Sequence, residues 1–250
     1  MPLHKSLAVC ICCLPLLAVV APHRAEAGVP KKGLIGYWSG DGNALDSSPT
    51  GNNGSFAGPY VPGSHCHHVA FDVFTNKVYI PNSSLYDFEN YPGWTVGFWF
   101  NADQEVVNTG NAFFLGQDDG SGYQNKWEVE YRYSVYISGS TGTFVLHLND
   151  PQQLRIFIES QPVAFPSGWN QLTVVWTKYP GAVSFYLNGQ SIGTDSYGGI
   201  IPYPSADLIF GSAESGLGYN GLLDYVAIYN RALTAKQVQD LARPQHMCPS

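Results

Sequence analysis

The segment Gly221–Ala242 constrains the fold more than any other part of the chain, because a β-strand within it runs directly into a capped helix. Between residues 222 and 229, apolar side chains alternate on both faces, which is typical of a strand covered on both sides. Asp224 falls on the same face as Val226 and Ile228. A carboxylate there is costly to bury unless a cation or several hydrogen-bond donors receive it.

The end of this segment carries the signals of a short helix. Thr234 is a suitable N-cap, and Gln237 three residues later completes a capping box. Leu233 can pack against Val238 as a hydrophobic staple, and Pro244 prevents the helix from continuing. We therefore expect one helix between Thr234 and Pro244.

The chain before this segment shows the period-two alternation of short strands separated by turns. Asn188 and Gly189 form the strongest hairpin signal, because both turn positions favour positive φ. About a dozen short strands predict an all-β, two-sheet antiparallel sandwich with a short C-terminal helix. The expected strands are 34–38, 69–71, 77–80, 94–100, 112–115, 127–137, 143–148, 154–159, 171–177, 183–187, 190–193, 207–210 and 222–229.

Four sets of residues occur in the order and with the separations of one known domain type: 36–46 with 51–54, 94–100, 169–176 with 185–189, and 221–241. On these residues the chain resembles the LamG-like jelly-roll domains (bacterial laminin G-like type) of the concanavalin A-like lectin/glucanase superfamily. The resemblance covers residues 34–242 and implies two curved antiparallel sheets stacked face to face, with the first and last strands adjacent. Tyr225 and Ala227 depart from the family pattern, which has charged residues there, and region 117–162 is longer and more aromatic.

The first 27 residues are expected to be a signal peptide. Lys5 precedes an almost wholly apolar run, Ser6–Val20, and Ala25 and Ala27 supply the small residues before a cleavage site. The run is about 15 residues long, whereas a spanning helix needs roughly 20, so no membrane span is expected after cleavage. The expected organisation is a signal peptide (1–27), a leader (28–33), one jelly-roll domain (34–242) and a C-terminal tail (243–250), in a secreted protein, or a periplasmic one if the source has two membranes.

The chain is acidic, with 12 basic and 19 acidic residues and a formal net charge of −7. Nucleic acid is not an expected partner, because binding phosphates needs clustered Lys and Arg. Cys66 and Cys248 remain after signal cleavage, and in an exported protein we expect them to form a disulfide. The alternative is a zinc or copper site made with the neighbouring histidines, without a standard ligand spacing: His65, His67, His68 and His246.

Oxygen ligands gather near the start of the domain, in a glycine-rich loop. The spacing of Asp41, Asn43 and Asp46 suits calcium, which takes six to eight oxygen ligands. The resemblance implies a structural calcium near this point, and adjacent first and last strands would bring Asp224 close. The candidate ligands are therefore Asp41, Asn43, Asp46 and Asp224. The alternative is that these side chains only form Asx-turns in the loop.

The segment 126–132 sets Glu128 and Glu130 on one strand face, about 7 Å apart along the strand. Retaining glycosidases use two carboxylates about 5 to 5.5 Å apart. Jelly-roll glucanases place theirs along a single strand, in the pattern Glu-x-Asp-x-Glu or Glu-x-Asp-x-x-Glu. Here the Asp of the glucanase pattern is missing between the two glutamates, and Arg132 stands where a further acid would be. The sequence therefore favours a cross-strand ion-pair face with Arg132 over a catalytic pair.

Sugars bind by laying apolar ring faces on aromatic side chains while nearby polar groups bind their hydroxyls. Trp38, Trp94, Trp127 and Trp176 are expected in the core. Five tyrosines in or beside glycine-rich loops are candidates for a binding rim: Tyr123, Tyr136, Tyr197, Tyr203 and Tyr219.

The expected function is that of a secreted, non-enzymatic binding or adhesion domain that recognises carbohydrate or an extracellular or cell-surface protein, with a structural calcium as a secondary expectation. One alternative is a glycoside hydrolase of the jelly-roll glucanase type that uses Glu128 and Glu130. Another is a structural envelope or matrix component without a small ligand. Fold alone does not decide among these.

Overall fold

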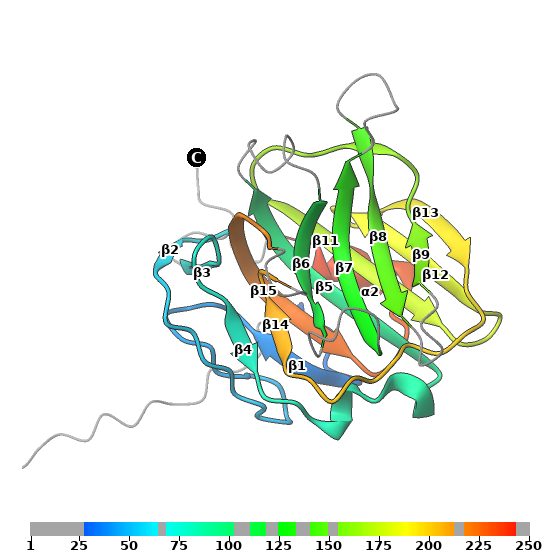
Figure 1. The fold of residues 1–250 in the computed structure, drawn as a ribbon, viewed down its shortest axis with the longest axis horizontal. Helices are drawn as coiled ribbons and strands as arrows, with labels where there is room; N and C mark the ends of the chain where they lie inside the picture. Colours follow the sequence, from blue (N-terminus) through cyan, green and yellow to red (C-terminus); the bar gives the residue numbers. More distant parts are fainter. Residues whose placement is uncertain are drawn as a thin grey trace, which may run out of the picture.

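Two antiparallel sheets stack face to face in the computed structural model, which describes residues 28–64, 69–102, 111–118, 125–133, 141–149, 155–212 and 218–243 (Figure 1). In spatial order, sheet A consists of β13 (Gln190–Ser196), β12 (Ala182–Leu187), β11 (Asn170–Thr177), β5 (Gly93–Ala102), β15 (Gly221–Tyr229), β3 (Val69–Asp72) and β2 (Tyr60–Pro62), with β1 (Leu34–Trp38) also paired to β15. Sheet B consists of β10 (Val163–Ala164), β8 (Thr141–Asn149), β7 (Lys126–Tyr133), β6 (Asn111–Gln117), β14 (Leu208–Phe210) and β4 (Val78–Ile80), with β9 (Arg155–Glu159) paired to β8.

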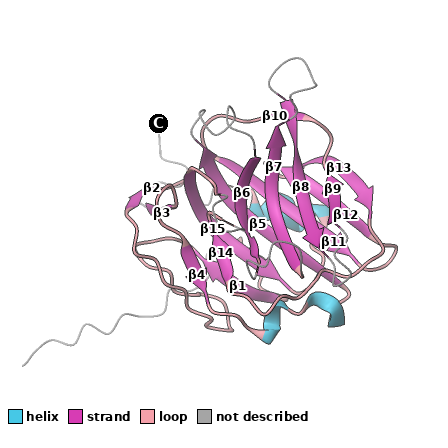
Figure 2. Cartoon of the chain, in the orientation of Figure 1, coloured by secondary structure: helices cyan, strands magenta, loops and turns pink. Residues whose placement is uncertain are grey.

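Helical structure in the described residues is limited to short segments outside the sheets (Figure 2). These are the 3-10 helices η1 (Ser84–Tyr86) and η2 (Phe88–Asn90) and the α-helix α2 (Ala235–Leu241). None of the helices in the described ranges has the length and apolar character needed to cross a membrane. The all-β, two-sheet jelly-roll class with a short C-terminal helix is therefore confirmed.

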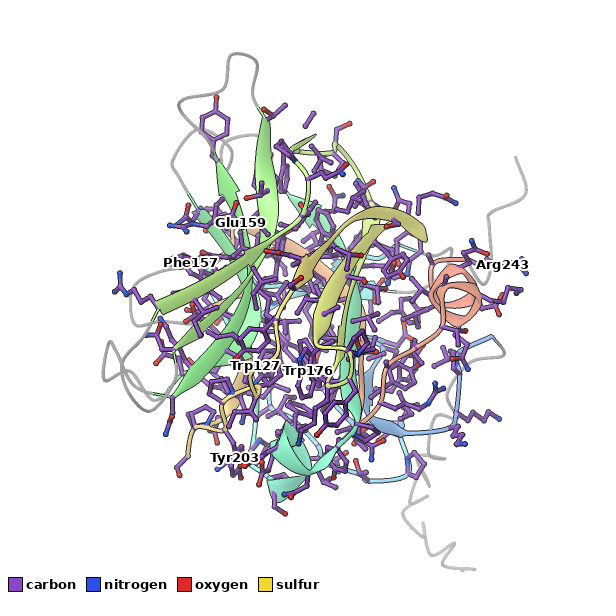
Figure 3. The ribbon with its side chains drawn as sticks, turned by 90° about the vertical axis from the view of Figure 1, so that its right-hand side faces the viewer. Trp127, Phe157, Glu159, Trp176, Tyr203 and Arg243 are labelled. Carbon is purple, nitrogen blue, oxygen red and sulfur yellow. The ribbon has the colours of Figure 1, made fainter. Side chains whose placement is uncertain are left out.

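The main core lies between the sheets and is rich in aromatic rings. Trp94, on the inner face of β5, packs edge-on against Trp127 of β7, with ring centroids 5.1 Å apart. Figure 3 shows Trp127 and Trp176 between the two layers. All four tryptophans expected in the core are fully buried: Trp38, Trp94, Trp127 and Trp176.

A second hydrophobic cluster covers the opposite face of sheet A, beneath α2. Tyr225 and Ala227 of β15 belong to it, together with Val238 and Leu241 of the helix. The terminal strand is thus covered on both sides, as its sequence predicts. Tyr225 and Ala227, which depart from the family pattern, are buried in this cluster. The helix begins with the expected capping box, in which Gln237 N donates to Thr234 Oγ1 and Thr234 N donates to Gln237 Oε1.

A β-bulge in β15 corrects the predicted position of Asp224. The pairing register with β5 shifts between Asp224 and Ala227, and Tyr225 adopts a φ of 48°. Asp224 consequently lies opposite Trp99, on the helix-covered face, rather than sharing the inner face of Val226 and Ile228. Strict alternation fails here because a bulge inserts an extra residue and reverses the facing of the side chains that follow.

The predicted pairings agree with the structure in other respects. β1 pairs with β15, so the first and last strands are adjacent, and Asn188 and Gly189 both have positive φ in the turn between β12 and β13. Each expected strand is present where the structure describes it, with ends that differ by a few residues. The short strands β2 and β10 were not predicted, because segments of two or three residues show no measurable alternation.

Candidate functional site

The outer face of sheet B carries an unusual row of charged and polar side chains. Along β7, Trp127 and Val129 point into the core, so Lys126, Glu128 and Glu130 point outward. All three outward side chains are nevertheless buried, with Lys126 and Glu128 at 0% and Glu130 at 1% exposure. Buried charges are costly unless they are paired, so each of them requires partners on this face.

The neighbouring strands supply those partners. On β8, His147 lies directly opposite Glu128 and Asn149 lies opposite Lys126. Phe157 of β9 lies opposite His147. We call Lys126, Glu128, Glu130, Arg132, His147, Asn149 and Phe157 the polar face.

Ion pairs connect the strands across the polar face. His147 Nδ1 lies 2.9 Å from Glu128 Oε2 and 3.8 Å from Glu130 Oε1. Lys126 Nζ lies 3.2 Å from Glu128 Oε1 and 3.7 Å from Asp118 Oδ2. Glu128 therefore stands between two potential cations, and His147 stands between two carboxylates.

The margin of the polar face combines a cation with an aromatic ring. Arg132 Nε lies 3.6 Å from Glu130 Oε1, and the guanidinium carbon lies 4.1 Å from the centroid of the Phe157 ring. The His147 ring is 4.5 Å from the Phe157 ring. Figure 3 shows Phe157 and the exposed Glu159 on the strand layer opposite α2.

Burial raises the pKa of the Glu130 carboxyl to about 7, from an ordinary value of 4.5. Arg132 and Lys126 lower this pKa, whereas the carboxylates of Glu128 and Glu159 raise it. Desolvation is the largest of these effects, since the charged form of a buried carboxyl loses its water. Glu130 can therefore hold or release a proton near neutral pH.

Two buried polar atoms of the polar face have neither a hydrogen-bond partner nor an ion pair among the described residues. They are Glu130 Oε2 and Asn149 Nδ2. Most buried polar side-chain atoms in proteins have such a partner, and exceptions often mark functional positions. Both oxygens of Glu128 lie within 3.2 Å of Lys126 or His147, so the unused hydrogen-bonding capacity belongs to Glu130 and Asn149.

The sequence anticipated the contact between Arg132 and Glu130, but it did not indicate that Glu128 and Glu130 are buried. His147 was missed as a site residue. Alternation along β8 turns its side chain outward, but its position opposite Glu128 depends on the register between β7 and β8. A single sequence does not specify that register.

Asp46, a predicted calcium ligand, is held by donors of the chain itself. Its Oδ1 accepts two backbone hydrogen bonds and its Oδ2 accepts three more bonds. The donors are Tyr37 N, Ser48 N, Ser48 Oγ, Thr50 Oγ1 and Asn52 N, at 2.8 to 2.9 Å. A cation at Asp46 would have to displace several of these donors, so the carboxylate as it stands does not fit a calcium ligand.

Asn43 forms the Asx-turn that was the alternative to metal binding, with its Oδ1 accepting from Leu45 N at 2.9 Å. Asp224 accepts hydrogen bonds from Ser64 N and Ser64 Oγ, both at 2.9 Å, and from Tyr225 N at 3.0 Å. The buried Asp224 carboxylate is therefore hydrogen-bonded by donors of the chain itself.

Burial raises the pKa of Asp224 well above its ordinary value, the bonds from Ser64 lower it, and the nearby charge of Asp41 raises it further. Asp41 and Asp224 are thus neighbours, whereas Asp46 is engaged elsewhere. In the described ranges no group of three or more His, Cys, Asp or Glu side chains is arranged to hold a metal ion. Calcium binding stays a prediction. The four residues predicted as ligands do not form one complete set in the structure.

The three described rim tyrosines all pack against the protein. Tyr219 is fully buried in the main core, 4.8 Å from the Phe114 ring, rather than at a rim. Tyr197 donates to Ile200 O at 2.6 Å and Tyr203 donates to Asn82 Oδ1 at 3.2 Å. The remaining predicted residues lie outside the described ranges: Tyr123, Tyr136, Cys66, Cys248, His65, His67, His68 and His246.

Comparison with solved structures finds similar domains in an extracellular arabinanase and in toxins. Domain 4 of the extracellular arabinanase AbnA from Geobacillus stearothermophilus, in complex with arabinotriose, has a TM-score of 0.61 and 19% identity, covering 84% of this chain and 98% of that chain. The binding domain of Paraclostridial Mosquitocidal Protein 1 has a TM-score of 0.65 and 18% identity, covering 85% and 52%. The binding domain of botulinum neurotoxin DC in complex with SialylT has a TM-score of 0.64 and 14% identity, covering 86% and 52%.

At these identities the structural likeness demonstrates a shared fold only. The chain spans about half the length of the two toxin domains. No curated protein sequence matches it. Residues 72–239, more than half of the chain, match the laminin G family model described as the concanavalin A-like lectin/glucanases superfamily. With its two stacked sheets and adjacent first and last strands, the chain belongs to this superfamily as a LamG-like jelly-roll domain.

Proposed function

We propose that this protein is a secreted, non-enzymatic carbohydrate-binding domain whose ligand contacts the polar face of β7 to β9. The observation that carries the proposal is a pair of buried hydrogen-bonding atoms without partners, Glu130 Oε2 and Asn149 Nδ2, beside the ion-paired Glu128. Sugar hydroxyls both donate and accept hydrogen bonds, so they can satisfy carboxylate oxygens and an amide at the same time. Paired charges alone would leave these atoms unsatisfied.

Access to the polar face would begin at its margin. Glu128 and Asn149 are fully buried, whereas Arg132 and Phe157 are partly exposed and Glu159 is exposed. A saccharide would first meet the Arg132 guanidinium and the Phe157 ring, which provide a cation and an apolar surface. Contact between its hydroxyls and the deeper carboxylates requires the side chains that cover them to move aside, because Glu128 and Glu130 are buried.

The similar structures support carbohydrate as the ligand class. The arabinanase domain is described in complex with arabinotriose, and the botulinum neurotoxin binding domain in complex with SialylT. The segment before Gly28 supports secretion, because it has the positive charge, apolar run and small residues of a signal peptide. An extracellular or cell-surface protein is the competing partner class.

A glycan array followed by affinity electrophoresis in soluble polysaccharides tests this proposal. Wild-type protein is expected to bind at least one glycan, and Glu128→Gln, which keeps the side-chain shape, is expected to lose most of that binding. Glu89→Gln is the matched control, because Glu89 is exposed outside the polar face. Absence of glycan binding by correctly folded wild-type protein, together with capture of an extracellular matrix protein, would favour the protein partner instead.

A glycoside hydrolase is the second candidate, favoured by the pKa of Glu130. A carboxyl with a pKa of about 7 beside another carboxylate matches the general acid of a glycosidase. Release of reducing ends from a glucan and galactan panel would support it, provided that Glu130→Gln abolishes the release and preserves binding. Binding without hydrolysis would exclude catalysis on those polysaccharides. A structural envelope component without a small ligand predicts that neither activity is found.

A further inference from the structure

A second concave site lies at the β4 edge of sheet B, away from the polar face. It is a pocket of about 330 Å³, lined by Ser55, Phe56, Thr75, Asn76, Lys77 and Tyr79. Figure 1 shows β4 beside β14 at the side of the sheet opposite β8 and β9. Small-molecule sites range from about 300 to 1,000 Å³, so this pocket has room for a small ligand or the end of a longer one.

The backbone frame of the pocket is firmly held. Ser55 N donates to Tyr79 O at 2.8 Å and Tyr79 N donates to Ser55 O at 3.0 Å, which fixes the two walls against each other. Phe56 packs edge-on against Tyr60 and Phe71, each with ring centroids 5.2 Å away. The aromatic wall formed by Phe56 is therefore anchored to the main core.

Gly58 allows the two lining segments to approach each other. A Cβ at this position would lie 2.4 Å from Phe56 Cζ and 2.7 Å from Asn76 Cβ. Real Cβ atoms do not approach so closely, so a larger residue would push Asn76 and Phe56 apart. The sequence thus keeps the aromatic ring and the amide close to one another.

The Tyr79 side chain offers an aromatic surface to solvent. Val78 and Ile80 on either side are fully buried, so alternation directs Tyr79 outward, where 47% of the residue is exposed. An exposed aromatic ring beside a pocket provides a surface on which the apolar face of a ligand can lie. Ser55, Thr75 and Asn76 place hydroxyl and amide groups in the same pocket.

The only charged residue lining this pocket has its charge directed to the protein. Lys77 Nζ donates to Val73 O at 3.0 Å and to Gly211 O at 2.5 Å, and burial lowers the pKa of its ammonium. The other lining side chains are neutral. This combination of aromatic and neutral polar groups suits an uncharged polyhydroxylated ring better than an anion.

We propose that this pocket is a second saccharide site, which binds the terminal unit of a neutral glycan by stacking on Tyr79 and by hydrogen bonds to Asn76 and Ser55. Only its ligand class depends on the proposed carbohydrate function. Its location is independent of the polar face, so one protein could hold two points of the same glycan, or two glycans.

Isothermal titration with neutral oligosaccharides tests this site, with sialylated and uronic-acid oligosaccharides as the charged comparison. Tyr79→Ala is expected to weaken binding of the neutral ligand at least about tenfold, a loss of about 1.4 kcal/mol. Tyr79→Phe keeps the ring and is expected to bind like wild type, which separates stacking from a folding defect. Tyr179→Ala, at the most exposed of the tyrosines that the structure describes, is the matched control.

The outcomes distinguish the two sites. Binding weakened by Tyr79→Ala but unaffected by Glu128→Gln would support the pocket and overturn the polar face as the ligand site. Saccharide binding that is unchanged in Tyr79→Ala, or that is found only with charged saccharides, would overturn the pocket as a neutral-saccharide site. If that binding is lost in Glu128→Gln, the polar face remains supported as the ligand site. Absence of saccharide binding by wild-type protein would overturn both.

Discussion

His147 Nδ1 lies 2.9 Å from Glu128 Oε2, and the two residues are direct neighbours across strands β8 and β7. This contact brings a titratable ring and a fully buried carboxylate together on the outer face of a sheet. An outward face usually meets water, whereas here it carries buried ions with unused hydrogen-bonding atoms. The proposed carbohydrate binding depends on this arrangement.

Glu130 should make stability depend on pH. In the folded protein the Glu130 carboxyl has a pKa of about 7 and keeps its proton up to about that pH. In the unfolded chain it releases the proton near its ordinary pKa of 4.5. The contribution to stability is therefore complete below about pH 4.5 and is lost as the pH rises to about 7. Over this range, the unfolding free energy of wild type minus that of Glu130→Gln should fall by roughly 3 kcal/mol in urea titrations. Parallel pH profiles of the two proteins would contradict the raised pKa.

Asp46 should be a major determinant of stability, because its carboxylate accepts five hydrogen bonds. Asp46→Ala leaves these donors without their acceptor, and we expect a loss of about 3 to 5 kcal/mol in unfolding free energy. Asp195→Ala removes an exposed carboxylate on β13 and serves as the control in the same urea titration. A small effect of Asp46→Ala, similar to that of Asp195→Ala, would show that the network contributes little.

Gly116 permits the close approach of β6 to the polar face. A Cβ there would lie 2.4 Å from Trp127 O and 2.9 Å from Glu128 Cα. Gly116→Ala should therefore cost about 1 to 3 kcal/mol by overpacking, and it should also weaken glycan binding because it displaces Glu128. Gly198→Ala is a suitable control, because nothing lies within 4 Å of its added Cβ. Equal melting temperatures for the two variants would argue against the tight contact.

The capping box of α2 should stabilise the cluster on the outer face of sheet A. Thr234→Ala removes the acceptor for Gln237 N, and we expect a loss of about 1 kcal/mol. Thr234→Ser retains a hydroxyl and should recover most of it, as measured by thermal unfolding. If both variants melt like wild type, the helix does not contribute through its cap.

The sequence predicts local features well where they depend on short-range rules. The capping box at Thr234, the hairpin at Asn188 and the inward face of β5 all follow from spacing and turn preferences, and the structure contains each of them. Asp224 shows the limit of these rules. One bulge moves it to the other face of the sheet, and no pattern within a single strand indicates where a bulge will form.

The candidate site was harder to predict because it depends on pairing between strands. Glu128 and Glu130 are recognisable as a same-face pair from one segment. Their contact with His147 requires the register of β7 against β8, and their burial depends on packing beyond the strand itself. The pocket beside Tyr79 likewise joins residues from two separate segments, 55–57 and 75–79, which show no common motif.

The most direct test of the central claim is an NMR titration that follows the imidazole signals of His147 while the glycan identified on the array is added. His147→Gln assigns these signals by their disappearance. Binding at the polar face predicts a saturable shift of the His147 resonances, with the same dissociation constant as calorimetry on the same glycan. If the glycan binds and the His147 resonances do not change, the ligand does not contact the polar face and the central claim is contradicted.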